Sequence, residues 1–176
     1  MKRNVWLFAC IGVLFAAIGM YMGLRAGTAS APEAASSPAV AGLFSQTMAD
    51  ANGGAAGLAQ WKGKPMIVNF WATWCAPCVQ EMPELSALQI ELAPKKVQIV
   101  GIGIDSPSNI KEFSAKYKIS YPLYVAGMSG TQLSREFGNQ AGGLPFTVLL
   151  SADGRIIKTY LGKLKMDELR RDIAAL

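Results

Sequence analysis

Two cysteines three positions apart, Cys75 and Cys78, lie where an apolar run ends and a helical pattern begins. Residues 66–70 form a near-continuous apolar run with the length of a strand that is buried on both faces. After the cysteines, apolar residues recur at the spacing of a buried helix face, at Val79, Met82, Leu85, Leu88 and Leu92. The sequence therefore predicts a strand, a short loop and a helix whose first turn carries both thiols.

This placement suits thiol-disulfide exchange, which needs two sulfur atoms close enough to bridge and one accessible thiolate. Free amide donors and the positive end of the helix dipole stabilise a thiolate at a helix N-terminus. We therefore expect Cys75 to be the attacking sulfur. Cys78, one turn later and more buried, is expected to resolve the mixed disulfide formed with a substrate.

The same two cysteines are open to other interpretations. A four-cysteine zinc site needs a second pair, and the third cysteine, Cys10, lies in an apolar segment where it serves as a small hydrophobic residue. A purely structural bridge is disfavoured because so short a loop closes too little chain. A Cu(I) site built from Cys75, Cys78 and a methionine remains the non-enzymatic alternative, since soft sulfur ligands suit that ion.

The chain contains no histidine, which removes the commonest metal ligand and proton shuttle. Nucleophile pairs that depend on histidine are excluded, and Val79 after Cys78 excludes a haem-attachment CxxCH motif. The formal net charge is +5, but no run of Lys and Arg exceeds two residues, so nucleic-acid binding is not expected. We expect no cofactor and no metal ion.

Residues 5–24 carry no charge, and twenty residues are enough to cross a hydrocarbon core of about 30 Å as a helix. A cleaved signal peptide is the alternative, but the best cleavage site, at residues 29–31, is followed by Pro32, which favours a retained anchor. Lys2 and Arg3 should stay cytoplasmic, which directs the rest of the chain to the periplasm or the outside.

Three parts are therefore expected along the chain. Residues 1–24 form a transmembrane anchor in the cytoplasmic (inner) membrane, residues 25–42, rich in Ala, Ser, Pro and Gly, form a flexible linker, and residues 43–176 form one folded domain.

Strands and helices alternate along this domain. Further strands are expected at residues 97–104, 123–125, 146–150 and 155–160, and further helices after Ser106-Pro107, at 131–137 and from Met166 to Leu176. Asp153-Gly154 marks a hairpin between the last two strands, and the Gly/Ala-rich residues 51–57 read as a loop. This order predicts an α/β fold with a mixed sheet and helices on both faces.

The residues around the cysteines resemble the thioredoxin superfamily, and specifically its membrane-anchored TlpA/ResA-like branch. The resemblance rests on residues 68–78, VNFWATWCAPC, followed by Glu81-Met82-Pro83, and it extends over about residues 43–176. It implies a thioredoxin-like fold in which the stretch between Asp105 and Pro145 holds an inserted helix and strand.

Leu144 and Pro145, ahead of a strand, resemble the cis-proline loop of this family, which lies against the two cysteines and offers backbone groups to a substrate peptide. The resemblance implies that these two residues contact substrate together with Trp74, Ala76 and Pro77.

Two departures from the family pattern bear on the mechanism. Asn69 stands where thioredoxin has a buried aspartate, so another acid must move the proton. Glu81 matches the active-site glutamate of the branch, and a carboxylate there would relay protons and raise thiol pKa values. Without the resemblance, Glu81 reads as a solvated charge on the helix surface. Phe146 follows Pro145, where the family often has a small polar residue.

The resemblance also implies partners. It predicts a reductase of the cell envelope that is recharged by a membrane electron-transfer protein and acts on apocytochrome c cysteines or on other protein disulfides. The Ala76-Pro77 spacer brings no cation to stabilise a thiolate, and a weakly stabilised reduced form favours giving electrons away. A thiol oxidant is the alternative direction.

Overall fold

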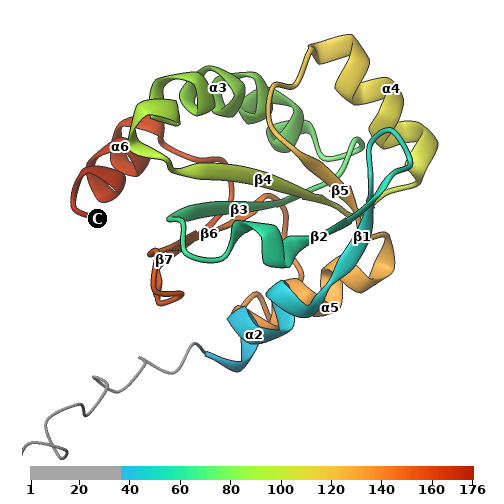
Figure 1. Ribbon diagram of the computed structural model, residues 1–176. Coiled ribbons are helices and arrows are strands. Elements are labelled where there is room, and N and C mark those ends of the chain that lie inside the picture. Colours follow the sequence, from blue (N-terminus) through green and yellow to red (C-terminus); the bar gives the residue numbers. More distant parts are fainter. Residues whose placement is uncertain (1–36) are drawn as a thin grey trace, which may run out of the picture. The chain divides into compact units, whose positions relative to one another are not determined.

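The structure, a computed structural model, describes residues 37–176. Its centre is a seven-stranded mixed sheet in the order β2-β1-β5-β4-β3-β6-β7 (Figure 1). The parallel strands β3, β4 and β5 lie together, and the remaining neighbours pair antiparallel. The strands are β1 (Thr47–Asp50), β2 (Ala55–Gly57), β3 (Met66–Trp71), β4 (Gln98–Gly103), β5 (Leu123–Val125), β6 (Phe146–Leu150) and β7 (Ile156–Leu161).

Helices cover both faces of the sheet (Figure 1). They are α2 (Pro38–Ser45), α3 (Ala76–Leu92), α4 (Pro107–Tyr117), α5 (Met128–Glu136) and α6 (Met166–Ala174), with short 3-10 turns η1 (Leu58–Trp61) and η2 (Ala93–Lys95). On one face α3, α4 and α6 pack against the sheet, and on the other α2 and α5 do. The predicted α/β fold with helices on both faces is confirmed.

The central strand β3 shows how the sequence separates the two faces. All six of its residues are buried. Ile67 and Trp71 belong to the apolar cluster under α3, whereas Met66, Val68 and Phe70 belong to the cluster on the opposite face. The alternation of side chains along a strand therefore places Asn69 on the same side as Trp71, toward α3.

The start of α4 follows its sequence signals. Ser106 is the N-cap residue, its Oγ accepts a hydrogen bond from the backbone N–H of Asn109 at 3.3 Å, and Pro107 occupies the first helical position. In α3, Cys75 takes the N-cap position and Pro83 lies inside the helix.

The edge of the sheet differs from the sequence prediction. Residues 51–57 were expected to be a loop, but β2 occupies Ala55–Gly57 and pairs with β1. Neither short strand carries an apolar alternation, and of their side chains only Met48 is buried. The last helix was expected to run to Leu176, but α6 ends at Ala174 and Leu176 is 44% exposed.

The predicted linker boundary at residue 42 is also wrong, because α2 begins at Pro38 and is part of the folded domain. Ser37 caps this helix, and its Oγ accepts a hydrogen bond from the N–H of Val40 at 3.3 Å. Val40 and Leu43 are fully buried against the sheet.

The predicted anchor, residues 1–24, lies outside the described residues. Within residues 37–176, every helix is too short or too polar to cross a membrane.

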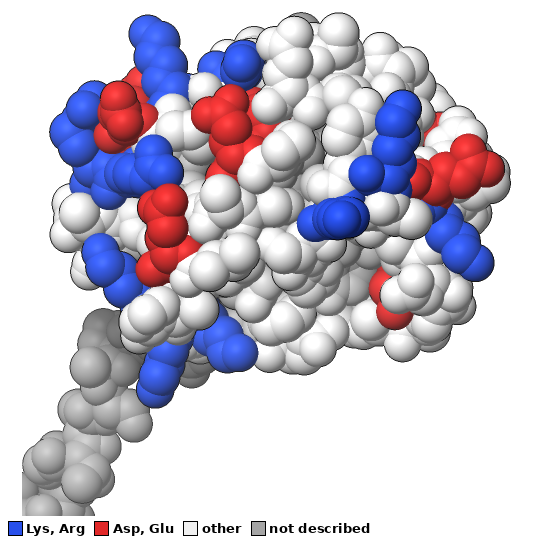
Figure 2. Space-filling model, turned by 90° about the horizontal axis from the view of Figure 1, so that it is seen from above, with Lys and Arg blue, Asp and Glu red and all other residues white. Residues whose placement is uncertain are grey.

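Charge is mixed on the face that α3 and α4 cover. Figure 2 shows basic and acidic side chains together at both flanks of this face, with a broad uncharged area between them. This visible face has no basic stripe of the kind that binds nucleic acid.

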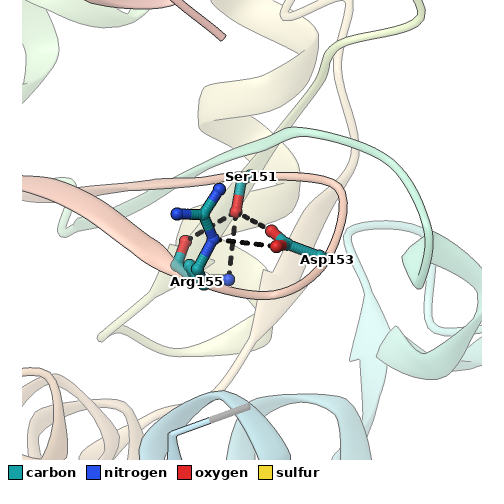
Figure 3. A network of polar contacts seen from close by, with 3 residues as sticks. All are labelled: Ser151, Asp153 and Arg155. Atoms are coloured by element: carbon teal, nitrogen blue, oxygen red, sulfur yellow. Dashed lines mark hydrogen bonds and ion pairs between the residues drawn. The ribbon is translucent and has the colours of Figure 1, made fainter. Parts of the chain in front are cut away.

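The predicted hairpin joins β6 to β7. Its turn is held by Asp153, which accepts hydrogen bonds from the hydroxyl of Ser151 and from Nε of Arg155, the latter at 2.8 Å (Figure 3). Because Met66 at the start of β3 pairs with Leu150, this turn lies at the opposite end of the sheet from the cysteines.

Candidate active site

Cys75 and Cys78 form a disulfide, with their Cα atoms 5.2 Å apart. The strand β3 ends at Trp71 and the helix α3 begins at Ala76, so the pair lies at the strand-to-helix junction that the sequence predicts. The Sγ of Cys75 accepts a hydrogen bond from the backbone N–H of Cys78 at 3.3 Å. Cys75 retains 6% exposure and Cys78 none, so Cys75 is the sulfur that a partner reaches first.

The predicted substrate-contacting residues beside the cysteines differ in exposure. Trp74 is 70% exposed, and Ala76 is also exposed, whereas Pro77 is half-buried. Trp74 therefore offers the largest apolar surface next to Cys75.

The loop before β6 lies at the same end of the sheet, because Phe70 pairs with Phe146. The peptide bond between Leu144 and Pro145 is cis. The carbonyl of Pro145 accepts a hydrogen bond from the N–H of Gly162 at 2.8 Å, so that group already has a partner. Phe146 points into the core, with its ring centroid 6.0 Å from that of Phe70, and contributes to packing.

Glu81 is fully buried, so the interpretation of this residue as a solvated surface charge is wrong. Its Oε1 accepts a hydrogen bond from Nδ2 of Asn69 at 2.8 Å, and its Oε2 accepts one from the backbone N–H of Leu164 at 2.9 Å. Burial raises the pKa of Glu81 to about 7, although both hydrogen bonds oppose that shift. A carboxyl group with this pKa can take up or release a proton near neutral pH.

Asn69 and Thr147 complete the support of Glu81 through contacts that the sequence did not predict. The two residues pair across β3 and β6, and Nδ2 of Asn69 also donates to Oγ1 of Thr147 at 3.0 Å. Both are fully buried. The sequence does carry a sign of these contacts, because Asn69 and Thr147 are polar residues inside two otherwise apolar strands.

Tyr121 belongs to the apolar cluster that contains Cys75 and Cys78, and its hydroxyl is buried without a hydrogen-bond partner among the described residues. Its pKa lies well above the ordinary value because of burial and because of the nearby negative charge of Glu81. Tyr121 therefore stays protonated, and Glu81 is the buried group near the disulfide that titrates in the neutral range.

The arrangement combines an oxidised cysteine pair at a helix N-terminus with one buried acid on the same helix. This is the minimum set for exchange of a disulfide with transfer of a proton. Among residues 37–176, no group of three or more His, Cys, Asp or Glu side chains could hold a metal ion.

Comparison with known proteins gives consistent matches. Residues 28–175 match the Redoxin family. The thiol-disulfide oxidoreductase ResA of Bacillus cereus (strain ATCC 10987 / NRS 248) is 31% identical over 170 residues, which cover 96% of this chain and 95% of that protein. The ResA of Bacillus cereus (strain ZK / E33L) is 30% identical over 109 residues, and there the match spans only 61% of each protein.

A solved structure agrees with these relatives. The thiol:disulfide interchange protein of Chlorobium tepidum TLS, a thioredoxin family protein, is 28% identical and superposes with a TM-score of 0.64. The match covers 74% of this chain and 91% of that one.

Proposed function

Because this chain belongs to the Redoxin family and is a ResA-like thiol-disulfide oxidoreductase, we propose that it works as a reductase of protein disulfides in the cell envelope. The observation that carries the proposal is the fully buried Glu81 on the helix that begins at the cysteine pair. A carboxylate there opposes formation of a nearby thiolate, and the Ala76-Pro77 spacer supplies no cation to offset it. A weakly stabilised dithiol gives up its electrons readily.

In the proposed reaction, the Cys75 thiolate attacks a substrate disulfide and releases one substrate thiolate, leaving a mixed disulfide. Glu81 then accepts the proton of the Cys78 thiol, and the Cys78 thiolate attacks Sγ of Cys75. The second substrate thiolate leaves and is protonated, so the substrate gains two electrons and the protein becomes the disulfide seen here. A membrane electron-transfer protein supplies the two electrons that restore the dithiol.

We propose oxidised apocytochrome c as one substrate. The reduced protein is expected to reduce a peptide that carries an oxidised CxxCH sequence. Its midpoint potential should lie closer to the roughly −270 mV of thioredoxin than to the roughly −120 mV of strong oxidants. A potential near the second value would assign the opposite direction of electron flow.

A titration of the reduced protein with Cu(I), run beside the peptide assay, tests the copper-carrier alternative. Tight binding of Cu(I) by the reduced protein, without any exchange with the peptide disulfide, would favour a copper carrier. Cys10→Ser is the control variant and should change neither result.

We also propose that residues 1–24 anchor the protein in the cytoplasmic membrane with the folded domain on the outer side. Cell fractionation is expected to recover full-length protein with the membrane. Protease added to spheroplasts should digest the domain while cytoplasmic markers survive. A soluble mature form that begins near Pro32 would contradict the anchor.

A further inference from the structure

The two carboxylate oxygens of Asp105 accept hydrogen bonds from two different parts of the chain. Its Oδ1 accepts hydrogen bonds from the N–H of Ser106 at 2.7 Å and from Nδ2 of Asn109 at 2.8 Å, both at the start of α4. Its Oδ2 accepts hydrogen bonds from the N–H of Thr73 at 3.1 Å and from the hydroxyl of the same residue. One side chain therefore ties the loop before the cysteines to the beginning of α4.

The position of Thr73 gives this contact its significance. Thr73 precedes the exposed Trp74 and lies two residues before Cys75. Asp105 follows β4 at the same end of the sheet, where the N–H of Ile104 still donates to the carbonyl of Trp71 at 2.8 Å. The contact therefore fixes the loop from the side of α4.

We propose that Asp105 is a positioning residue for the redox pair, which holds Thr73 so that Trp74 and Cys75 meet a protein disulfide in a fixed geometry. This role rests on the proposed disulfide exchange. Asp105 would contribute to that reaction through Thr73, without touching the sulfur atoms. It predicts that a large substrate, which must align with the loop, depends on the contact more than a small one does.

A carboxylate suits this position because all four of its partners are donors. These hydrogen bonds lower the pKa of Asp105 although its partial burial opposes the shift, so the group is charged at neutral pH. An amide at position 105 would turn its NH2 group toward one pair of donors. Asp105→Asn should therefore break either the two hydrogen bonds to the start of α4 or the two hydrogen bonds to Thr73.

The sharper test acts on Thr73, because Thr73→Val removes only the hydroxyl and keeps the shape of the side chain. We expect this variant to lower kcat/KM for a protein disulfide about tenfold, which is the scale of one hydrogen bond to a charged group. The rate with the small disulfide 5,5′-dithiobis(2-nitrobenzoate) should stay within about twofold. Thr73→Ser keeps the hydroxyl and should restore the rate with the protein disulfide.

The hairpin between β6 and β7 offers a matched control. There Asp153 accepts a hydrogen bond from the hydroxyl of Ser151, far from the cysteines (Figure 3). Ser151→Ala also removes a hydrogen bond that a hydroxyl donates to an aspartate, and it should leave the rates with both disulfides unchanged. Thermal unfolding of each variant shows whether a change in rate follows from a loss of folded protein.

The outcomes separate the two proposals. If the wild-type protein reduces both disulfides and Thr73→Val reduces the protein disulfide at the wild-type rate, the positioning role is wrong and the proposed function stands. Equal losses with both disulfides, or failure of Thr73→Ser to restore the rate, would also overturn the role. A wild-type protein inactive toward both disulfides would overturn the proposed function and the positioning role with it.

Discussion

Cys75→Ser is expected to abolish the reduction of protein disulfides, whereas Cys78→Ser should accumulate a mixed disulfide between Cys75 and the substrate. The attacking sulfur must be the one that a substrate reaches, and Cys75 is the more exposed of the two, at the N-terminus of α3. Without the thiol of Cys78, nothing on the same helix turn releases the trapped substrate.

Non-reducing electrophoresis and mass spectrometry measure this result. Reduced Cys78→Ser protein is mixed with an oxidised peptide, and the adduct is mapped by digestion. Cys10→Ser in the same background controls for adducts on the third cysteine. Accumulation of the adduct in Cys75→Ser, on Cys78, would reverse the assigned roles of the two sulfur atoms.

Glu81→Gln is expected to slow the reduction of a protein disulfide on the order of 10²-fold at neutral pH, which is the usual scale for loss of a general base. The variant should also lose the pH dependence near pH 7 that ionisation of Glu81 gives the wild-type rate. The pKa of Cys75 in the reduced protein should fall, because a neighbouring negative charge is removed. Alkylation rate against pH measures this thiol pKa.

The polar contacts of Glu81 indicate that a glutamine can be accommodated. Oδ1 of Asn69 has no hydrogen-bond partner among the described residues. Rotation of the Asn69 amide would present this oxygen to the NH2 group of the new side chain, while the new carbonyl still accepts from Leu164. The variant is therefore expected to fold, and its slower rate reports on the lost carboxylate.

Stability against pH tests the same carboxyl group independently of activity. Its pKa is about 7 in the folded protein and 4.5 when the group is unperturbed, so the folded state binds the proton more tightly. This contribution to stability is fully present below about pH 4.5 and is lost as the pH rises through about 7. Between pH 5 and 8, the wild-type free energy of unfolding should fall by about 3 kcal/mol more than that of Glu81→Gln.

Glu84→Gln is the control for both measurements. Glu84 lies on the same helix, and its side chain is 51% exposed and 3.9 Å from the ammonium group of Lys163. The charge of Glu84 is the smallest of the influences on the pKa of Glu81, which it raises, so its removal should leave the rate unchanged and move the pH profile only slightly to lower pH. Equal behaviour of Glu81→Gln and Glu84→Gln would show that Glu81 takes no part in proton transfer.

The parts of the fold that the sequence predicted are those with a local signal. The strands at 123–125 and 146–150 have the predicted bounds, since apolar runs bordered by turn residues define them. The start of α4 follows from a capping serine and a proline. By contrast, β1 and β2 are held by pairing at the edge of the sheet, which leaves little periodicity in the sequence.

The site divides in the same way. The cysteine pair is recognisable because its chemistry depends on residues three positions apart. The burial of Glu81 could have been predicted from the sequence. Glu81 lies three residues after Cys78 and four before Leu85, a spacing that places it on the buried face of the helix. The contact between Thr73 and Asp105 joins separate elements, and no local pattern predicts it.

The hydrogen bond from Leu164 to Glu81 has a consequence for synthesis of the protein. It joins residues 83 positions apart, and Leu164 packs in the same cluster as Leu169 and Ile173 of α6. On a ribosome, the cysteines emerge long before this segment does. Until it folds into place, Glu81 lacks part of its cover and its pKa stays nearer the ordinary value. A nascent chain therefore acquires an acid tuned to neutral pH only once the segment that contains Leu164 has folded against α3.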